Sequence, residues 1–358
     1  MARNMRDLSF ATFNLYNLHL PGEPIYTNTG GLSEAHYQAK LDWIARMLAQ
    51  LDADVIGFQE LWRIEALAAA FALARERYGL ADYDLVARNR YPAAIQVALA
   101  AKKGLLVAES AQWIDQFPEA CRFVDLRESR DARETINLTL ERFSRPPLRL
   151  RIQPRGRGPK PPEVVVYVAH LKSKGPSSLR SDSANPVLTQ HRAIASSVAS
   201  HVRRIAEVGA LRAMLDLEMG DNDIPFVVLG DLNDGTEAIS TELLSADPGY
   251  RLVAKSRAGN RSDRGLYSVE KLQQLRSFRH VYYTHVYQNK MESLDHILVS
   301  DAFYDAATNR KWSFREMTGF NDHLCHDSGT ARLQQGVSDH AVVRAEFDWN
   351  PMPSVAED

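Results

Sequence analysis

Residues 225–234 read PFVVLGDLND, and this segment decides the fold that the sequence predicts. Its apolar half shows no alternation of polar and apolar residues, which is typical of a strand buried on both faces. Gly230 frees the backbone where the strand ends, and Asp231, Asn233 and Asp234 follow directly. Carboxylates and amides crowded at such a point repel one another and cost desolvation energy. We therefore expect a positive partner there, and a divalent cation with a phosphate fits best.

The composition describes an ordinary globular protein with a large core. The chain has 358 residues, of which 45% are hydrophobic and 25% are charged, and its formal net charge is -2. Because large sandwich and α/β folds reach this length as one unit, we expect a single domain over residues 1–358. The near-neutral charge excludes a global basic field, so a polyanionic substrate must be met by a local patch.

Cysteine usage and the N-terminus indicate the compartment. Cys121 and Cys325 are far apart in the sequence, and one pair is not a disulfide framework. The first residues lack the apolar core of a signal peptide, and no run approaches the ~18 apolar residues of a membrane span. We therefore expect a cytoplasmic protein in a reducing compartment, without membrane insertion. Nothing in the sequence calls for an obligatory protein partner.

The rest of the chain alternates between strands and helices. A strand–helix–strand rhythm opens it and later strands arrive in hairpins, which indicates a mixed rather than a purely parallel sheet. Helix 33–50 has apolar residues at helical spacing, with Ser33 as its expected N-cap. The other predicted helices are 64–78, 188–219 and 237–244, and the other predicted strands are 8–13, 54–58, 83–88, 95–100, 134–143, 148–152, 164–169, 293–300 and 341–347.

Polar side chains stand at the ends of six predicted strands. They are Asn14, Glu60, His170, Asp231, Asn233, Asp295, Asp339 and His340. Carboxylates suit a hard cation with oxygen ligands, histidines and asparagines suit phosphate oxygens, and a further carboxylate suits the orientation of a histidine. No cysteine ligand, serine nucleophile elbow or glycine-rich phosphate loop competes with this interpretation. The pattern predicts a catalytic site where the strand ends converge.

Six motifs in chain order resemble the endonuclease/exonuclease/phosphatase superfamily, which has the deoxyribonuclease I-like fold. They are FNLYN, DVIGFQE, VAHLKSK, GDLND, LDHILVS and SDH, of which GDLN and the terminal SDH are the most specific. The resemblance spans almost the whole chain. It implies a four-layer α/β sandwich, in which two packed, mixed and mostly antiparallel β-sheets are flanked by helices. It also implies a Mg²⁺- or Mn²⁺-dependent phosphoesterase that uses water directly, without a covalent intermediate.

The resemblance also implies which residues hold the metal. By motif position, Glu60 is the principal metal ligand. Asn14 is its neighbour at the metal–phosphate edge. Asp339 is a second carboxylate on the metal side.

On the phosphate side, the resemblance implies a division of labour. Asp231 orients or deprotonates the attacking water, and Asn233 and His170 hold non-bridging phosphate oxygens. His340 contacts the phosphate or the leaving oxygen, and Asp295 orients it in a pair that favours the imidazolium. In-line displacement needs these parts: a placed nucleophile, neutralised equatorial oxygens and a stabilised leaving group.

Other polar residues have simpler interpretations. Asp234 is expected to be a turn or helix-cap residue, and His296 to point to the opposite face from Asp295. The histidines and aspartate of residues 323–327 have metal-compatible spacing, but a solvated loop is the expectation. Residues 145–160 are expected to form a soluble hairpin, with substrate binding as the minority interpretation.

Within the phosphoesterase class, a nuclease acting on DNA or RNA is the first expectation. The stretches HLKSK and FSRPPL resemble bacterial nuclease-type members, and the tryptophan-cysteine-aspartate-arginine signature of inositol-phosphatase members is absent. The near-neutral charge counts against it, because nucleic-acid binders usually display a basic stripe. The alternatives are a phosphatase or phosphodiesterase of a small phosphorylated metabolite or lipid headgroup, and a catalytically silent binding module on the same scaffold.

Overall fold

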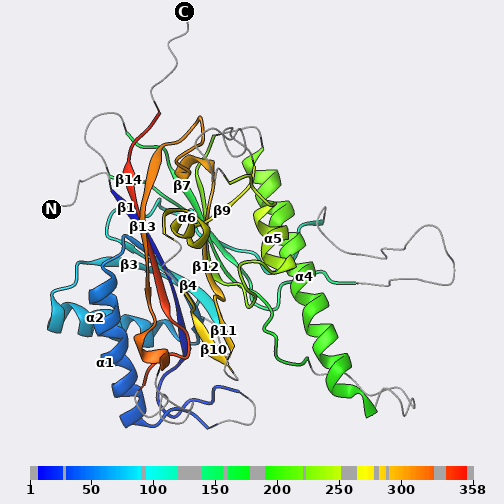
Figure 1. Ribbon diagram of the computed structural model, residues 1–358. Helices are drawn as coiled ribbons and strands as arrows, with labels where there is room; N and C mark the ends of the chain where they lie inside the picture. Colours follow the sequence, from blue (N-terminus) through cyan, green and yellow to red (C-terminus); the bar gives the residue numbers. More distant parts are fainter. Residues whose placement is uncertain are drawn as a thin grey trace, which may run out of the picture.

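Two six-stranded β-sheets form the centre of the molecule (Figure 1). The computed structural model describes residues 7–26, 30–89, 94–119, 139–155, 160–177, 190–220, 223–250, 264–277, 282–287, 290–325 and 336–352. The first sheet, in spatial order, contains β13 (Trp312–Phe320), β14 (Val342–Trp349), β1 (Leu8–Leu18), β2 (Val55–Leu61), β4 (Gln96–Lys102) and β3 (Tyr83–Val86). The second contains β5 (Gln112–Trp113), β6 (Leu148–Ile152), β7 (Val164–His170), β8 (Phe226–Asp231), β12 (Asp295–Val299) and β9 (Tyr267–Ser268).

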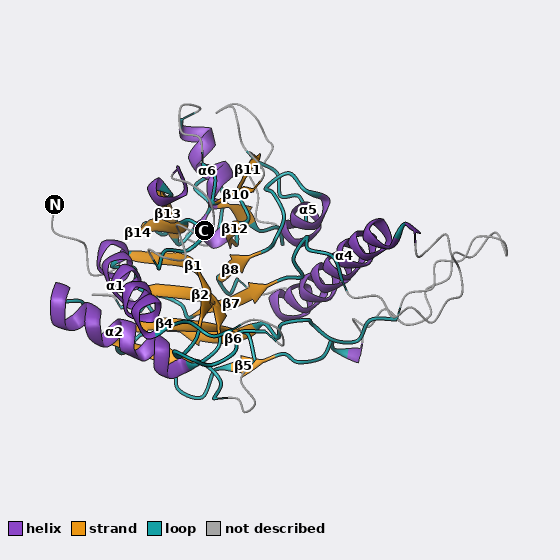
Figure 2. Cartoon of the chain, turned by 90° about the horizontal axis from the view of Figure 1, so that it is seen from below, coloured by secondary structure: helices purple, strands orange, loops and turns teal. Residues whose placement is uncertain are grey.

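Helices cover the outer faces of both sheets (Figure 2). The helices are α1 (Glu34–Leu51), α2 (Ile64–Tyr78), α4 (Arg192–Met219), α5 (Ile239–Ser245) and α6 (Val269–Arg276), with single 3₁₀ turns at Asp301–Phe303 and Asp322–Cys325. One apolar cluster joins α1 and α2 to the first sheet, and another joins α4 and α5 to the second. A two-stranded hairpin, β10 (His285–Tyr287) and β11 (Lys290–Glu292), completes the described elements.

The main core lies between the two sheets. Its buried side chains include Phe10 and Val55 from the first sheet and Val168 and Leu229 from the second. The sheets approach so closely that a Cβ on Gly57 would lie 3.0 Å from the Leu229 Cβ. Strands such as β7 and β8 are buried on both faces, which explains their uninterrupted apolar sequences.

Pairing within each sheet is mixed and mostly antiparallel. Only β1–β2 and β7–β8 are parallel among the pairs of the described strands. The four-layer sandwich predicted from the sequence is therefore confirmed. Ser33 is also the N-cap of α1, because its side chain accepts a hydrogen bond from the His36 amide.

Some element predictions were wrong. The predicted strand 134–143 is not seen in its described part, where residues 140 and 142 make only single bridges, and residues 134–138 lie outside the described range. The sequence analysis also missed β13, α6 and the β10–β11 hairpin. The hairpin strands have three residues each, too few to show a periodicity of two. Among the described residues, no helix is both long and apolar enough to cross a membrane.

Candidate active site

The parallel pair β1–β2 brings two predicted residues to the same end of the first sheet. Asn14 is in register with Gln59, so Glu60 comes next to it. Both strands were expected to end here, but they continue through a shift in register. Glu60 itself has a positive φ of 59°. The Asn17 amide donates to Glu60 Oε2 at 3.1 Å, which fixes the carboxylate where the ladder is interrupted.

The parallel pair β7–β8 does the same in the second sheet. His170 is in register with Asp231, and Asp295 on β12 faces Asp231 from the other side. A Cβ on Gly230 would lie 2.0 Å from the Ala169 carbonyl oxygen, so only glycine fits just before Asp231. The Asn233 amide donates to Asp231 Oδ1 at 2.8 Å. The GDLN motif is thus explained by close strand packing and by a turn that holds the carboxylate.

Hydrogen bonds and short distances join the two sheets at this rim. Asn14 Nδ2 donates to Asp231 Oδ2 at 3.1 Å, although 217 residues separate them in the sequence. His170 Nε2 lies 3.5 Å from Asp231 Oδ2 and 4.0 Å from Glu60 Oε1. The ends of β1, β2, β7 and β8 therefore converge, as the sequence analysis predicted.

His340 is held by a buried carboxylate and by the turn that precedes β14. Its Nδ1 donates to Asp295 Oδ2 at 2.8 Å, and its Nε2 lies 3.9 Å from Asp231 Oδ2. The Ser338 hydroxyl accepts from the His340 amide at 3.0 Å and donates to the Asn14 carbonyl at 2.9 Å. Burial alone would lower the pKa of His340, but the charges of Asp295 and Asp231 raise it well above 6.5. The imidazolium is therefore the stable form in this arrangement.

Burial and neighbouring charges also shift the pKa values of Asp231, Glu60 and His170. Burial raises the pKa of Asp231 to about 7, although the His340 charge opposes the change. Burial, followed by the charge of Asp339, raises the pKa of Glu60. Burial, followed by the nearby Arg145 guanidinium, keeps the pKa of His170 well below 6.5. Acidic groups that resist ionisation and repel one another indicate a place for a cation.

The oxygen atoms at the rim fit a hard divalent ion. Asp339 Oδ1 is buried and has no hydrogen-bond partner in the described part of the chain. Asp339 and His340 also cluster with His285, and His340 clusters with Asp231 and Asp295, all within ligand spacing. Because the Asp295 and Asp231 charges raise the pKa of His340 and its Nδ1 is bonded to Asp295, it is a poor ligand. Glu60 and Asp339 offer oxygen donors, the kind of ligand that Mg²⁺ and Mn²⁺ prefer.

Three residues near the rim were not among the predicted site residues, although substrate binding was the minority interpretation for the segment 145–160 that begins with Arg145. Arg145 Nη1 and Asn233 Nδ2 both donate to the Leu171 carbonyl, at 3.0 and 3.1 Å. The His285 ring lies 4.8 Å from the His340 ring. Lys40 is buried on α1, three residues after Tyr37 and four before Ile44 on the same apolar face. A charged residue at core spacing was a signal that the sequence analysis overlooked.

The simpler interpretations hold for two residues. His296 Nε2 donates to the Asp234 carbonyl at 2.8 Å. Asp234 accepts from Ser240 Oγ at 2.7 Å and pairs with Arg204. Both support the loop after β8 and take no part in the Asp231–His340 cluster.

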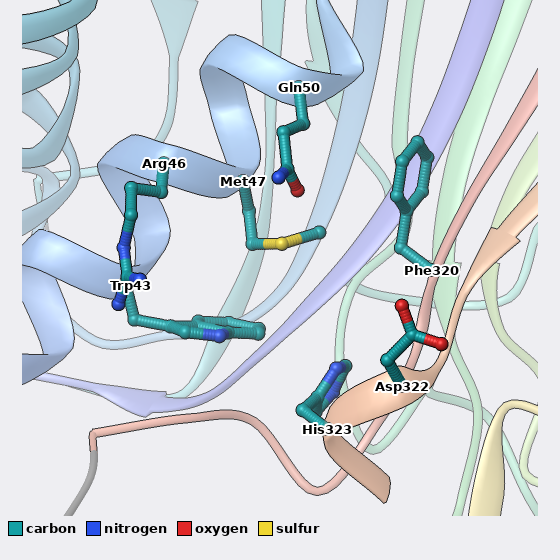
Figure 3. A pocket seen from close by; sticks show the side chains of 7 residues that line it. All are labelled: Trp43, Arg46, Met47, Gln50, Phe320, Asp322 and His323. Atoms are coloured by element: carbon teal, nitrogen blue, oxygen red, sulfur yellow. The ribbon is translucent and has the colours of Figure 1, made fainter.

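The histidine cluster of residues 323–327 divides in the structure. His323 donates from Nε2 to the His340 carbonyl at 2.9 Å and stacks edge-on against Trp43. Figure 3 shows the two rings in a surface pocket between α1 and the turn after β13. His326 and Asp327 lie outside the described residues. His323 therefore supports the backbone that carries His340, which the expected solvated loop did not anticipate.

Arg155, in the segment 145–160, lies away from this rim. Arg155 donates to the Lys103 carbonyl, just after β4. Since β4 runs antiparallel to β2, this is the end of the sheet opposite to Glu60. Arg157 lies outside the described residues. The position of Arg155 argues against a direct role in the site.

We expect Asp231→Asn to stabilise the metal-free protein increasingly as the pH rises from 4 to 8. The folded-state pKa is about 7, whereas the usual value is 3.8. Between these values the unfolded chain binds fewer protons than the folded one, so the wild-type free energy of unfolding falls as the pH rises. Asparagine carries no charge and removes this cost. The free energy of unfolding of the variant is therefore expected to exceed that of the wild type by about 1–3 kcal/mol at pH 8.

Thermal melting of chelator-treated protein measures this effect. Asp234→Asn is the matched control, because pairing with Arg204 and Ser240 lowers the pKa of Asp234 against the opposing effect of burial. The control is expected to destabilise the protein. An Asp231→Asn variant that is less stable than the wild type at pH 8 would contradict the prediction.

The chain belongs to the endonuclease/exonuclease/phosphatase family, whose family model matches residues 11–340. Its class is that of hydrolases acting on phosphoester bonds. A comparison with curated proteins gave no match.

Solved structures share the fold over 96% of the chain. An endonuclease/exonuclease/phosphatase from Bacteroides vulgatus is 13% identical, covered over 99% of its length, with a TM-score of 0.51. D. rerio TDP2 complexed with a single-strand DNA product is 15% identical, covered over 99%, with a TM-score of 0.50. A mannosyl-6-phosphatase from Bacteroides thetaiotaomicron is 13% identical, covered over 100%, with a TM-score of 0.50. At these identities the likeness shows the fold alone.

Proposed function

We propose that the protein hydrolyses phosphodiester bonds by direct attack of water, with Mg²⁺ or Mn²⁺ as cofactor and a nucleic acid as the favoured substrate. One observation carries the proposal. Asp231 lies within 4 Å of groups from three other segments, Asn14, His170 and His340. A buried acid surrounded by an amide and two imidazoles suits the activation of water beside a phosphate.

Glu60 and Asp339 would hold the divalent ion, with Asn14 at its edge. When bound, such an ion withdraws charge from the phosphate oxygens and from the leaving oxygen. Burial is the main cause of the raised pKa of Glu60, and repulsion from Asp339 is the second. A bound ion would relieve this repulsion. The Asn17 amide keeps Glu60 oriented toward the rim.

Asp231 would orient the attacking water and accept its proton. Its raised pKa of about 7 makes it a stronger base than an exposed aspartate. Asn233 and His170 would hold the non-bridging oxygens. His170 suits this role as a neutral imidazole, because burial lowers its pKa.

His340 would donate a proton or a charged hydrogen bond to the leaving oxygen. Asp295 orients the ring and stabilises the imidazolium through the 2.8 Å hydrogen bond. His340 Nε2, which lies 3.9 Å from Asp231 Oδ2, remains directed toward the reacting groups.

Two observations favour a nucleic acid over a small metabolite. Arg145 shares the Leu171 carbonyl with Asn233, so a guanidinium lies beside the proposed phosphate-binding residues. D. rerio TDP2, which has the same fold, was solved with a single-strand DNA product. The mannosyl-6-phosphatase neighbour and the net charge of -2 support the alternative, a phosphatase of a small phosphorylated metabolite. The complete acid–base cluster argues against a catalytically silent binding module.

A panel of substrates tests the proposal. Single- and double-stranded DNA, RNA, a small phosphodiester and a sugar phosphate monoester are incubated with Mn²⁺ at equal protein concentration. We expect cleavage of nucleic acid, with a kcat/KM well above that for the monoester. Preferential hydrolysis of the monoester would favour the phosphatase. If no substrate were hydrolysed, the result would favour the catalytically silent binding module.

A further inference from the structure

Lys40 is a buried cation beside the proposed metal-binding carboxylates. Only 3% of the residue is exposed, and it lies on the face of α1 that packs on the first sheet. Within the described residues, its ammonium makes no hydrogen bond or ion pair. Its Nζ lies 5.2 Å from the centre of the Tyr16 ring, which follows Asn14 on β1. Burial of an ammonium is costly, so its retention there needs a reason.

The charges that act on Lys40 belong to the active site. Burial lowers its pKa to about 8, and the negative charges of Asp339 and Glu60 oppose that change. The ammonium therefore interacts electrostatically with the two carboxylates that would hold the divalent ion.

Backbone packing fixes this arrangement. A Cβ on Gly336 would lie 2.4 Å from the Lys40 amide nitrogen, so the turn before Ser338 and Asp339 packs directly on α1. Gly336 has a positive φ of 71°, which also favours glycine. The distance between Lys40 and the Asp339 segment is thus set by main-chain contact, and not by a mobile side chain alone.

We propose that Lys40 is a positioning residue of the metal centre, whose ammonium balances Glu60 and Asp339 in the metal-free protein and competes electrostatically with the divalent ion. The inference rests on the proposed function, in which these two carboxylates are the ligands. A fixed positive charge near the ion repels it, while the same charge keeps the empty carboxylates together. Lys40 therefore weakens ion binding and preserves the geometry of the ligands.

The test replaces Lys40 by methionine, which has a similar length and no charge. Mn²⁺ binding to chelator-treated protein is measured by titration calorimetry. Lys40→Met is expected to bind Mn²⁺ about tenfold more tightly than the wild type, because one repelling unit charge is removed from a partly buried site. Lys40→Arg keeps the charge and is expected to bind within about twofold of the wild type.

Lys102→Met is the matched control. Lys102 is largely buried on β4, where it pairs with Asp52 and Asp54 at the opposite end of β2 from Glu60. Its substitution is expected to leave Mn²⁺ affinity unchanged. A second readout is the rise in Tm on adding Mn²⁺, which is expected to be larger for Lys40→Met than for the wild type. The rise in Tm can also be measured if a variant is less stable than the wild type.

The direction in which Lys40→Met changes the Mn²⁺ affinity distinguishes an electrostatic role of Lys40 from a packing role. If Lys40 only supported the packing of α1, its loss would displace Asp339 and weaken Mn²⁺ binding. Unchanged or weaker binding by Lys40→Met would therefore overturn the inference, while the proposed function stands if the wild type binds Mn²⁺ and Glu60→Gln does not. A wild type that binds no Mn²⁺ would overturn both.

Discussion

Replacement of His340 by alanine is expected to lower kcat by about 10²–10⁴-fold while the protein stays folded. His340 is the only group among the described residues that joins Asp295 at 2.8 Å and also faces Asp231. In the proposed mechanism, its loss removes the proton donor for the leaving oxygen. Asp295 then loses its charged partner, but a buried carboxyl can take up a proton and remain neutral.

The measurement is kcat on a small phosphodiester, together with circular dichroism and the Tm. His296→Ala is the matched control, because His296 is adjacent to Asp295 on β12 and, among the described residues, its side chain bonds only the Asp234 carbonyl on the loop side. We expect the control to lose stability and to keep kcat within about threefold. The kcat of Asp295→Asn is expected to lie between those of His340→Ala and His296→Ala, because asparagine preserves the position of the His340 ring and removes the charge beside it. Near-wild-type turnover by His340→Ala would mean that the pair is structural.

Replacement of Glu60 by glutamine is expected to abolish detectable Mn²⁺ binding and to lower kcat/KM by at least about 10³-fold. The amide has the shape of the carboxylate but no negative charge, and neutral amide oxygens are weaker ligands for hard cations. The variant is expected to fold at least as stably as the wild type without metal, because burial and Asp339 raise the pKa of Glu60.

Glu270→Gln provides the comparison for a buried glutamate outside the site. Glu270 lies on α6 and accepts from the Thr236 hydroxyl at 2.6 Å. Its substitution is expected to leave Mn²⁺ binding intact. If Glu60→Gln bound Mn²⁺ with wild-type affinity, the metal would have to be held elsewhere.

The sequence predicted the fold because its central strands carry unambiguous patterns. Segments such as 164–169 and 225–231 are apolar on both faces and end in polar residues, so the place where they deliver side chains was clear. The structure brings Asn14, Glu60, His170, Asp231 and His340 to one rim.

The sequence did not predict the features that depend on tertiary contacts. The segment 134–143 was predicted to be a strand, but in its described part residues 140 and 142 make only single bridges. A strand needs a neighbour to pair with, and the local sequence does not show whether one is present. Arg145 follows in an irregular segment, so its approach to Asn233 depends on how that segment folds over β7. Lys40 lies in a helix that was predicted from its apolar residues alone, although its spacing places it on the apolar face. Arg145 reaches the site through packing that no local pattern records.

The most direct test of the account is the rate of hydrolysis of a small phosphodiester by chelator-treated wild-type protein, before and after Mg²⁺ or Mn²⁺ is restored. The account predicts that turnover is lost on chelation and recovered with either ion. Equal rates with and without the chelator would contradict it.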